Sequence, residues 1–585
     1  MSTAIVTGQP VPGSSLEGEL RELGFDVRLA PDAADARAAL AAVPGDQRVA
    51  VVDAGFVGHV HALRLGLTDP RFAASAVPGA VSAQPAARQA LNRAVTENGI
   101  APDAVAKSLE AAGTPVHRPV LGELVAAVPH DPQARNEARQ RVAAVDDEAI
   151  RLRTAVKARD GFFTTHCVSP YSRYIARWCA RRGLTPNQVT TASLLTALIA
   201  AGCAATGTRP GFVAAGLLLL FSFVLDCTDG QLARYSLQYS TLGAWLDATF
   251  DRAKEYAYYA GLALGAANAN GDDVWALALG AMVLQTCRHV VDFSFNEANH
   301  DADANTSPTA ALSDKLDSVG WTVWVRRMIV LPIGERWALI AIFTALTTPR
   351  ITFWVLLVGC ALAACYTTAG RLLRSLTRKA RRTDRAAEAL AELADSGPLA
   401  QAIARVGKGA AAPVVAALGG AAVVTTSAFT GFGSGWPVLA AAVYCVTSGL
   451  AVARPLKGAL DWLVPPIFRA SEYLTILVLA ARADVNGALP AAFGLVAAVA
   501  YHHYDTVYRI RGDAGAPPRW LVRAIGGHEG RTLVVTAVAA LLTSTDFTVA
   551  LTALAVLVAL VVLAESIRFW VSAGAPAVHD EGEPA

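Results

Sequence analysis

Four aspartates lie at helical spacing between residues 226 and 251, in a part of the chain that is otherwise rich in apolar residues. Asp226 and Asp229 are three residues apart, and Asp247 and Asp251 are four apart, so each pair occupies one face of a helix. Two such helices joined by a short loop can bring all four carboxylates together. Acids near a membrane core are costly and need compensation, and Mg²⁺ supplies it by bridging carboxylates to substrate phosphates. The spacing therefore predicts a divalent-metal site for a phosphorylated substrate.

Residues close to these acids fit the same chemistry. Gly230 lets a substrate approach the backbone closely, and Arg234 offers a planar fork suited to phosphate. Gly243 lies one helical turn before Asp247 and leaves room above the acids. In the alternative interpretation, the acids only form ion pairs with the basic neighbours Arg234, Arg252 and Lys254. That alternative explains any single aspartate well, but it explains the whole spaced set poorly.

The complete pattern resembles the signature of the CDP-alcohol phosphotransferase family, and every defined position of that signature is matched. In this chain the pattern is Asp226-x2-Asp229-Gly230-x2-Ala233-Arg234-x8-Gly243-x3-Asp247-x3-Asp251. Thr185-Pro186-Asn187, upstream of it, is similar to a second feature of the family. The resemblance covers about residues 160–385. It implies a six-helix membrane fold, two divalent metal ions per active site (Mg²⁺ or Mn²⁺) and release of CMP.

The resemblance also implies a role for each matching acid. Asp226, Asp229 and Asp247 would hold one metal ion, while Asp226, Asp247 and Asp251 would hold the other. Asp251 would act as the general base that deprotonates the acceptor hydroxyl, which is reasonable for a carboxylate beside a metal-bound hydroxyl.

Two further sets of residues are assigned to substrates. By the resemblance, the CDP part of the donor would contact Gly230, Arg234 and Ser240. Cytosolic-side arginines are candidates for binding an anionic acceptor such as a sugar phosphate or inositol phosphate; these are Arg288, Arg326, Arg327 and Arg336. Arginines in such loops also serve the positive-inside rule, and that alternative stays open for all of them.

The composition predicts a membrane protein with a soluble N-terminal part. Hydrophobic residues make up 54% of the chain and charged residues 17%, against about 25% charged in an ordinary soluble protein. Residues 1–160 have soluble composition, whereas later stretches reach the roughly 20 apolar residues that a spanning helix needs. The expected spans are near 188–206, 210–226, 241–266, 272–295, 334–348, 350–373, 410–430, 436–453, 457–481, 486–507, 529–543 and 546–570.

We therefore expect a mainly α-helical multi-pass membrane protein with an N-terminal α/β soluble domain. The predicted divisions are a cytosolic α/β domain (1–130), a helical connector (131–160), the phosphotransferase-like membrane domain (161–385), a second membrane domain (395–572) and a disordered tail (573–585). Basic residues flank the spans on the side of the N-terminus, and no basic segment followed by an apolar one opens the chain. These features predict a cell-membrane protein whose N-terminal domain and active site are cytosolic. No basic stripe suggests nucleic acid.

The second membrane domain resembles a diverged copy of the first. Arg252-Ala-Lys-Glu255-Tyr256 recurs as Arg469-Ala-Ser-Glu472-Tyr473. Three other weak matches, one upstream and two downstream, occur in the same order in both halves, which favours duplication. Ser448 stands where the first copy has an acid. Asp461 is a possible counterpart of Asp247, although Pro465-Pro466 would then interrupt the helix. We predict that this half is catalytically silent and packs on the first half as an internal pseudo-dimer.

The soluble domain and membrane domain together resemble fused cytidylyltransferase–phosphotransferases of inositol phosphodiester synthesis. Ala4–Gly8 and Arg48–Asp53 read as strands, and Ser15–Leu23 and Ala33–Ala42 as helices, which is an α/β pattern. The Gly-rich basic loop that cradles a triphosphate is missing after Gly8. The domain is therefore expected to be a degenerate, nucleotidyltransferase-like binding or regulatory module.

The leading hypothesis is transfer of a phosphoalcohol from a CDP-alcohol to a hydroxyl acceptor in the bilayer. A lipid donor such as CDP-diacylglycerol and a polar donor such as CDP-inositol both stay open. The alternative is a catalytically inactive membrane scaffold that keeps the family fold; the intact acids disfavour it for the first half. A transporter would carry polar residues or broken helices at matching positions of both halves, yet the acids occur in one half alone.

Overall fold

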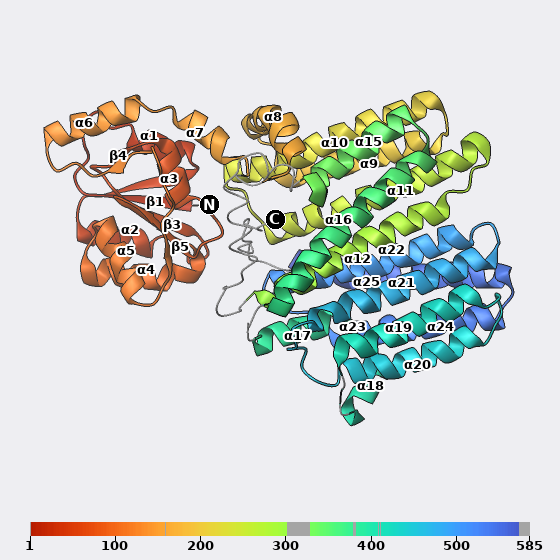
Figure 1. Cartoon of the computed structure of the whole chain (residues 1–585). Helices are drawn as coiled ribbons and strands as arrows, with labels where there is room; N and C mark the ends of the chain where they lie inside the picture. The colour runs from red at the N-terminus through yellow and green to blue at the C-terminus, as the bar shows by residue number, and fades with distance from the viewer. Residues whose placement is uncertain are drawn as a thin grey trace.

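The computed structural model describes residues 2–157, 160–300, 328–377, 382–407, 409 and 411–572. In the described part of the chain, a red-to-orange α/β region lies beside a much larger region of long helices (Figure 1). The candidate residues Arg326 and Arg327 and the expected tail, 573–585, lie outside the described residues.

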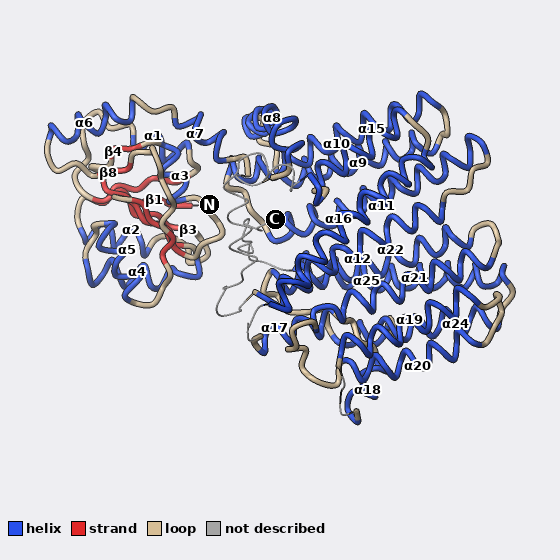
Figure 2. Tube along the Cα trace, in the orientation of Figure 1, coloured by secondary structure: helices blue, strands red, loops and turns tan. Residues whose placement is uncertain are grey.

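The N-terminal region is built on a mixed six-stranded sheet, which contains most of the strands drawn in red in Figure 2. The strand order is β2-β1-β3-β6-β5-β7, with β1 parallel to β2 and β3, and β6 antiparallel to β3 and β5. Its strands are β1 (Ser2–Thr7), β2 (Phe25–Ala30), β3 (Arg48–Asp53), β5 (Ala74–Val77), β6 (Ala80–Ala83) and β7 (Val116–His117). The central strands are buried because helices cover both faces, which explains their continuous apolar runs.

Helices flank this sheet and continue from it toward the membrane region. They are α1 (Leu16–Glu22), α2 (Ala33–Ala41), α3 (Val60–Leu67), α4 (Arg88–Asn98), α5 (Pro102–Ala111), α6 (Pro132–Ala143) and α7 (Asp147–Thr154). A short β4 (Val57–Gly58) pairs with β8 (Ala126–Ala127). The two strands and two helices predicted for residues 4–53 are all confirmed, with ends that differ by at most two residues.

Within the described residues, the first half of the membrane region contains one short helix and six longer ones. They are α8 (Ser169–Arg181), α9 (Pro186–Ala205), α10 (Arg209–Ser236), α11 (Thr241–Asn270), α12 (Trp275–Asn299), α15 (Ile333–Leu346) and α16 (Pro349–Thr377). Helix α9 begins with a capping box, in which Thr185 and Gln188 satisfy each other's backbone N–H groups, and Pro186 occupies the first turn. Helix α10 packs against α8, α9 and α15, and is thereby held at the centre of the half.

The second half repeats this order of elements. After α17 (Asp384–Leu393) come α18 (Pro398–Val406), α19 (Ala412–Phe429), α20 (Trp436–Ala451), α21 (Val464–Ala483), α22 (Ala488–Arg511), α23 (Arg519–Ala524), α24 (Gly527–Leu541) and α25 (Ser544–Ser572). Helix α20 packs against α18, α19 and α24, as α10 packs against α8, α9 and α15. The two halves thus share their helix pairings.

The predicted span over residues 457–481 was wrong about its start and about its prolines. Helix α21 begins at Val464, after a turn and a short 3₁₀ segment, and Pro465 and Pro466 lie in its first turn. Proline does not break a helix there, because the first N–H groups have no helical partner to lose.

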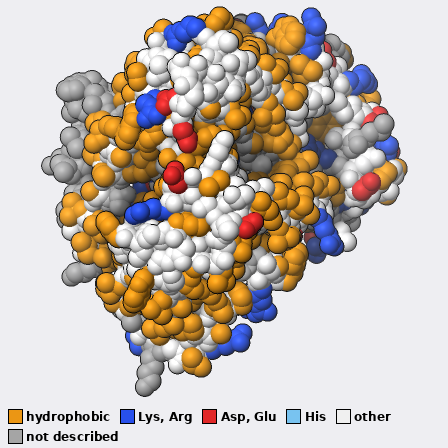
Figure 3. Space-filling view, turned by 90° about the vertical axis from the view of Figure 1, so that its right-hand side faces the viewer, with side chains coloured by type: hydrophobic (Ala, Val, Ile, Leu, Met, Phe, Trp, Pro, Cys, Tyr) orange, Lys and Arg blue, Asp and Glu red, His pale blue; other side chains and the backbone are white. Residues whose placement is uncertain are grey.

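Six helices in the described residues are long and apolar enough to cross a membrane: α9, α10, α16, α19, α25 and the segment Asp461–Ala483, which contains α21. Helices α11, α12 and α22 are also long, but each carries charged side chains that are buried between helices. On the face seen in Figure 3, hydrophobic side chains predominate and charged ones are few and scattered. These features make the chain a multi-pass membrane protein.

The two halves pack through corresponding helices. Helix α12 lies against α21 and α22, and α11 lies against α22 and α25. At this contact His289 Nδ1 is 2.6 Å from the Tyr504 hydroxyl, and the rings of Trp245 and Trp570 stack with centroids 6.2 Å apart. A single large core cluster contains residues of both halves, so the halves form one packed body.

Candidate active site

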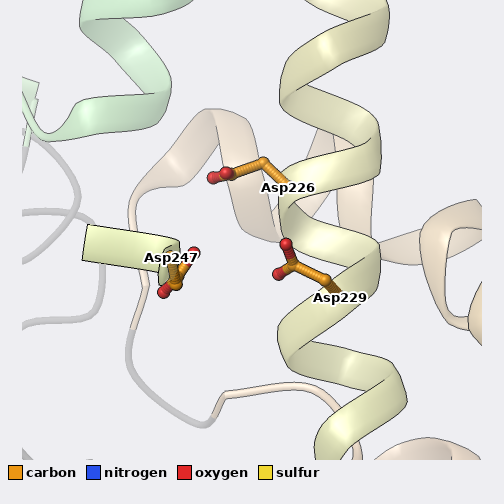
Figure 4. Close-up of side chains that lie close together, drawn as sticks. All are labelled: Asp226, Asp229 and Asp247. Carbon is orange, nitrogen blue, oxygen red and sulfur yellow. The ribbon is translucent and has the colours of Figure 1, made fainter. Parts of the chain in front are cut away.

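Three of the four aspartates converge between α10 and α11. Asp226 and Asp229 project from α10 toward Asp247, which comes from the first turns of α11 (Figure 4). One carboxylate oxygen from each residue lies within 4.8 Å of the other two. The helical spacing of the acids therefore produces the predicted convergence, although each pair lies inside its helix rather than at the helix end.

Asp251 reaches this group through a lysine. Its Oδ1 lies 2.9 Å from Nζ of Lys254, one turn farther along α11, and the same ammonium is hydrogen-bonded to Asp226. The ion-pair alternative from the sequence is thus correct in part. Lys254 does pair with two of the acids, while Asp229 and Asp247 have carboxylates turned toward a shared space.

The three converging carboxylates fit a hard divalent cation. Asp229 is 4% exposed, and its Oδ2 has no hydrogen-bond partner among the described residues. A buried carboxylate oxygen without a partner is costly, and an ion ligated by oxygen atoms removes that cost. Asp226, Asp229 and Asp247 would hold Mg²⁺ or Mn²⁺, and the ion would stabilise negative charge developing on phosphoryl oxygens.

The residues assigned to the CDP group lie in the C-terminal part of α10 and at the start of α11. A side chain at Gly230 would stand 3.5 Å from the Arg234 guanidinium, so the glycine keeps the space beneath that arginine open. Arg234 Nε donates to the Ala155 carbonyl at 2.6 Å. Ser240 caps α11, its Oγ accepting from the Gly243 backbone N–H at 2.9 Å.

The connector holds the end of α10 that carries this site. Arg151 Nε donates to the Tyr235 carbonyl at 2.7 Å and its guanidinium lies over the Tyr235 ring, while the Tyr235 hydroxyl donates to Glu148 at 2.8 Å. Burial lowers the pKa of Arg151 to about 10, which leaves it cationic at neutral pH. Arg71 of the soluble domain lies over the ring of Tyr239, in the loop between α10 and α11. These contacts could not be predicted from the sequence, because charged connector residues look like ordinary surface residues.

The candidate acceptor arginines have different environments. Arg288 is buried in α12 and donates through Nη2 to the Val330 carbonyl, but its Nε and Nη1 have no hydrogen-bond partner among the described residues. Arg336 is also buried, and both its Nε and Nη2 lie 3.2 Å from Glu255 oxygens. This pairing favours a structural role for Arg336 and leaves Arg288 as the described acceptor candidate.

Comparison with known families agrees with the geometry. The model of the CDP-alcohol phosphatidyltransferase family matches residues 183–365, which include all four aspartates. This segment is a CDP-alcohol phosphatidyltransferase domain. Residues 384–585 match a different model, a family of unknown function (DUF5941).

Several curated proteins are similar to part of the chain. The bifunctional IPC transferase and DIPP synthase of Thermococcus kodakarensis is 34% identical over 125 residues, 21% of this chain and 27% of the relative. The phosphatidylinositol phosphate synthase of Mycolicibacterium smegmatis is 29% identical over 189 residues, 32% of this chain and 78% of the relative. The archaetidylinositol phosphate synthase of Pyrococcus horikoshii is 35% identical over 91 residues, 16% of this chain and 47% of the relative. The match spans about a quarter of the length of the bifunctional relatives.

A buried ion cluster of the phosphatidyltransferase domain recurs in the second half, atom for atom. In the domain, Glu255 Oε1 lies 3.2 Å from Arg336 Nε, and its Oε2 lies 3.3 Å from Arg252 Nη1. In the second half, Glu472 Oε1 lies 2.5 Å from Arg531 Nε, and its Oε2 lies 3.1 Å from Arg469 Nη1. The recurrence supports duplication far more strongly than the sequence matches do.

The acids have no such counterparts. The shared Thr-x-Gly of α10 and α20 aligns Asp226 with Cys445 and Asp229 with Ser448, and the shared Arg-x-x-Glu of α11 and α21 aligns Asp247 with Val464 and Asp251 with Phe468. The Phe468 ring stacks on the His528 ring, with ring centroids 4.0 Å apart. His528 Nδ1 and the Tyr444 hydroxyl share a hydrogen bond of 2.8 Å. Packed rings occupy the region that holds acids in the first half.

Asp461 does not replace Asp247. By the alignment of α11 with α21 it corresponds to Ala244, and its carboxylate accepts from the Gly458 backbone N–H at 2.7 Å. The predicted correspondence is therefore wrong, since this aspartate stabilises a turn before α21.

Proposed function

We propose that the chain transfers a phosphoalcohol group from a CDP-alcohol to a hydroxyl acceptor and releases CMP, using the acids of residues 226–251. The observation that carries the proposal is the convergence of Asp226, Asp229 and Asp247 within 4.8 Å, inside a domain of the CDP-alcohol phosphatidyltransferase family. A scaffold that only kept the fold would have no need for a buried carboxylate oxygen without a partner.

The reaction balances without any further reactant. The acceptor oxygen attacks the phosphorus that carries the alcohol, and a new P–O bond forms while the bond to the bridging oxygen breaks. CMP leaves with that oxygen, and Asp251 takes the hydroxyl proton. Gly230, Arg234 and Ser240 would bind the CDP part, and Arg234 is held for this task by the Ala155 carbonyl.

An inositol phosphate is the acceptor class that fits best, with a lipid CDP-alcohol as donor. Relatives that match part of this chain are named as phosphatidylinositol phosphate and archaetidylinositol phosphate synthases. Buried Arg288, with Nε and Nη1 unpartnered among the described residues, offers two donors to an anion. A CDP-inositol donor, as in the layout of the bifunctional relatives, is the second candidate.

The active site would face the cytosol of the cell, next to the soluble domain. Arg177, Arg181 and Arg182 lie at the end of α8 on this side, as expected from the positive-inside rule. The second half would act as a catalytically silent partner in an internal pseudo-dimer, since its matching positions hold rings and small residues in place of acids.

Asp251→Asn tests the assignment of the general base. The variant should lose CMP formation by a factor of about 10³, within the range for removal of a general base, because an amide cannot accept the hydroxyl proton. Turnover would be measured as CMP released by the purified protein with Mg²⁺, after gel filtration shows a folded chain. Near-normal turnover by this variant would contradict the assignment.

A further inference from the structure

The side chain of Lys254 lies among the acids of the candidate active site. Its side chain is fully buried, and its ammonium contacts Asp226 on α10, Asp251 on α11 and Ser193 on α9. The ammonium donates hydrogen bonds to Asp226 and Ser193 and forms an ion pair with Asp251 Oδ1 at 2.9 Å. The Trp337 ring lies with its centroid 5.4 Å from Nζ and adds a cation–π contact.

The surroundings of Ser193 show that this place suits a cation. Ser193 Oγ donates its own hydrogen to the Ser222 carbonyl at 2.9 Å, which leaves a lone pair for Lys254 Nζ at 3.1 Å. Both serines are fully buried. Buried polar groups at membrane depth are held in place by their partners, so the ammonium has a defined position.

Comparison of the two halves distinguishes Lys254 from the charged residues of the buried ion cluster. Arg252 and Glu255, on either side of it in the sequence, are both kept in the second half as Arg469 and Glu472. Lys254 itself is replaced by Ser471, which only donates to the Ile467 carbonyl of its own helix. The lysine has thus been lost together with the four acids, and it belongs with them rather than with the ion cluster that maintains the fold.

We propose that Lys254 is the second cation of this active site. One divalent ion is held by Asp226, Asp229 and Asp247, and the ammonium replaces the second ion that Asp226, Asp247 and Asp251 would otherwise hold. The inference rests on the proposed function only in taking these acids as metal ligands. Two cations still flank the reacting phosphates, one of them supplied by the chain itself.

Metal counting on the purified full chain tests this inference. Mn²⁺ would be added in steps, and the free ion would be measured by electron paramagnetic resonance, so that the bound ion is the difference from the total. The same spectra would show whether two bound ions are spin-coupled. The wild-type chain should bind one Mn²⁺ tightly and show no coupled pair. Lys254→Met, which keeps the length of the side chain and removes its charge, should bind a second Mn²⁺ and show a spin-coupled pair.

Arg509→Met is the matched control, since Arg509 is a buried cation of the second half that pairs with Asp505 and Glu565. It should leave the count at one. Two tightly bound, spin-coupled ions in the wild-type chain would overturn the inference even if Lys254→Met failed to fold. A count of one in folded Lys254→Met would also overturn it. No bound Mn²⁺ in the wild type would instead refute the metal site of the proposed function itself, and the inference with it.

Discussion

The two membrane halves keep the same buried ion cluster but only one keeps the acids. Glu255 and Glu472 each bridge two arginines with the same atoms, although the sequences around them have diverged. Asp229 and its counterpart Ser448 share a place on the helix but share no chemistry. The cluster therefore reports what the fold shared by the two halves requires, whereas the acids are the residues that the proposed reaction would require.

The second half also contains a buried network of ion pairs centred on Asp395. Asp395 contacts Arg469 at 3.0 Å, Arg531 at 2.7 Å and His502 at 3.1 Å, all in the buried interior. Together with the stacked Phe468 and His528 rings, this network fills a region that would have to admit substrate in an active copy.

Removing an acid of the first half should have the largest effect on activity, whereas a substitution at a corresponding position of the second half should have none. Asp247→Asn should lower CMP release by a factor of about 10³ or more, because the site loses a charged ligand of its metal. Ser448→Ala, at the aligned position of Asp229 in the second half, should leave the rate unchanged. Steady-state CMP release by both variants is the measurement. A comparable loss in Ser448→Ala would mean that the second half takes part in the chemistry.

Breaking the ion cluster should lower stability in both halves. Glu255→Gln leaves the buried guanidinium groups of Arg252 and Arg336 without their carboxylate, a loss of about 3–5 kcal/mol for a buried ion pair. Glu472→Gln should lower stability less, because Arg469 and Arg531 still contact Asp395. Thermal unfolding in detergent should show lower midpoints for both variants. A midpoint unchanged in either one would contradict the shared structural role.

A substitution at the contact between the halves should have a smaller effect than a substitution of the acids or of the ion cluster. Tyr504→Phe removes the hydroxyl that lies 2.6 Å from His289 and should cost about 1 kcal/mol of stability. Its CMP release should stay near the wild-type rate at temperatures below the unfolding transition. A large loss of rate without loss of stability would show that the second half tunes the active site directly.

Much of the fold and the position of the acids could be predicted from the sequence. The spacing of Asp226, Asp229, Asp247 and Asp251 requires only helical geometry, and the structure places three of them together. The start of α21 could not be read from hydropathy, because residues 457–463 are apolar enough to extend a span while Gly458 and Asp461 form a turn.

The long-range partners could not be predicted. Lys254 could be paired with the acids from its spacing to Asp251, but its third acceptor, Ser193, lies 61 residues away on α9. The same holds for Arg151, whose partner Tyr235 is 84 residues farther along the chain. Such contacts depend on how helices pack, and local periodicity carries no information about that packing.

Release of CMP by the purified wild-type chain tests the central claim most directly. CDP-diacylglycerol and CDP-inositol would each be combined with a panel of acceptors that includes inositol phosphate, in Mg²⁺ or Mn²⁺ and again with a chelator. We expect CMP from at least one pair, dependent on the divalent ion, with the lipid donor and inositol phosphate giving the highest rate. No CMP from any pair would contradict the account and favour a scaffold that has kept the fold of the family.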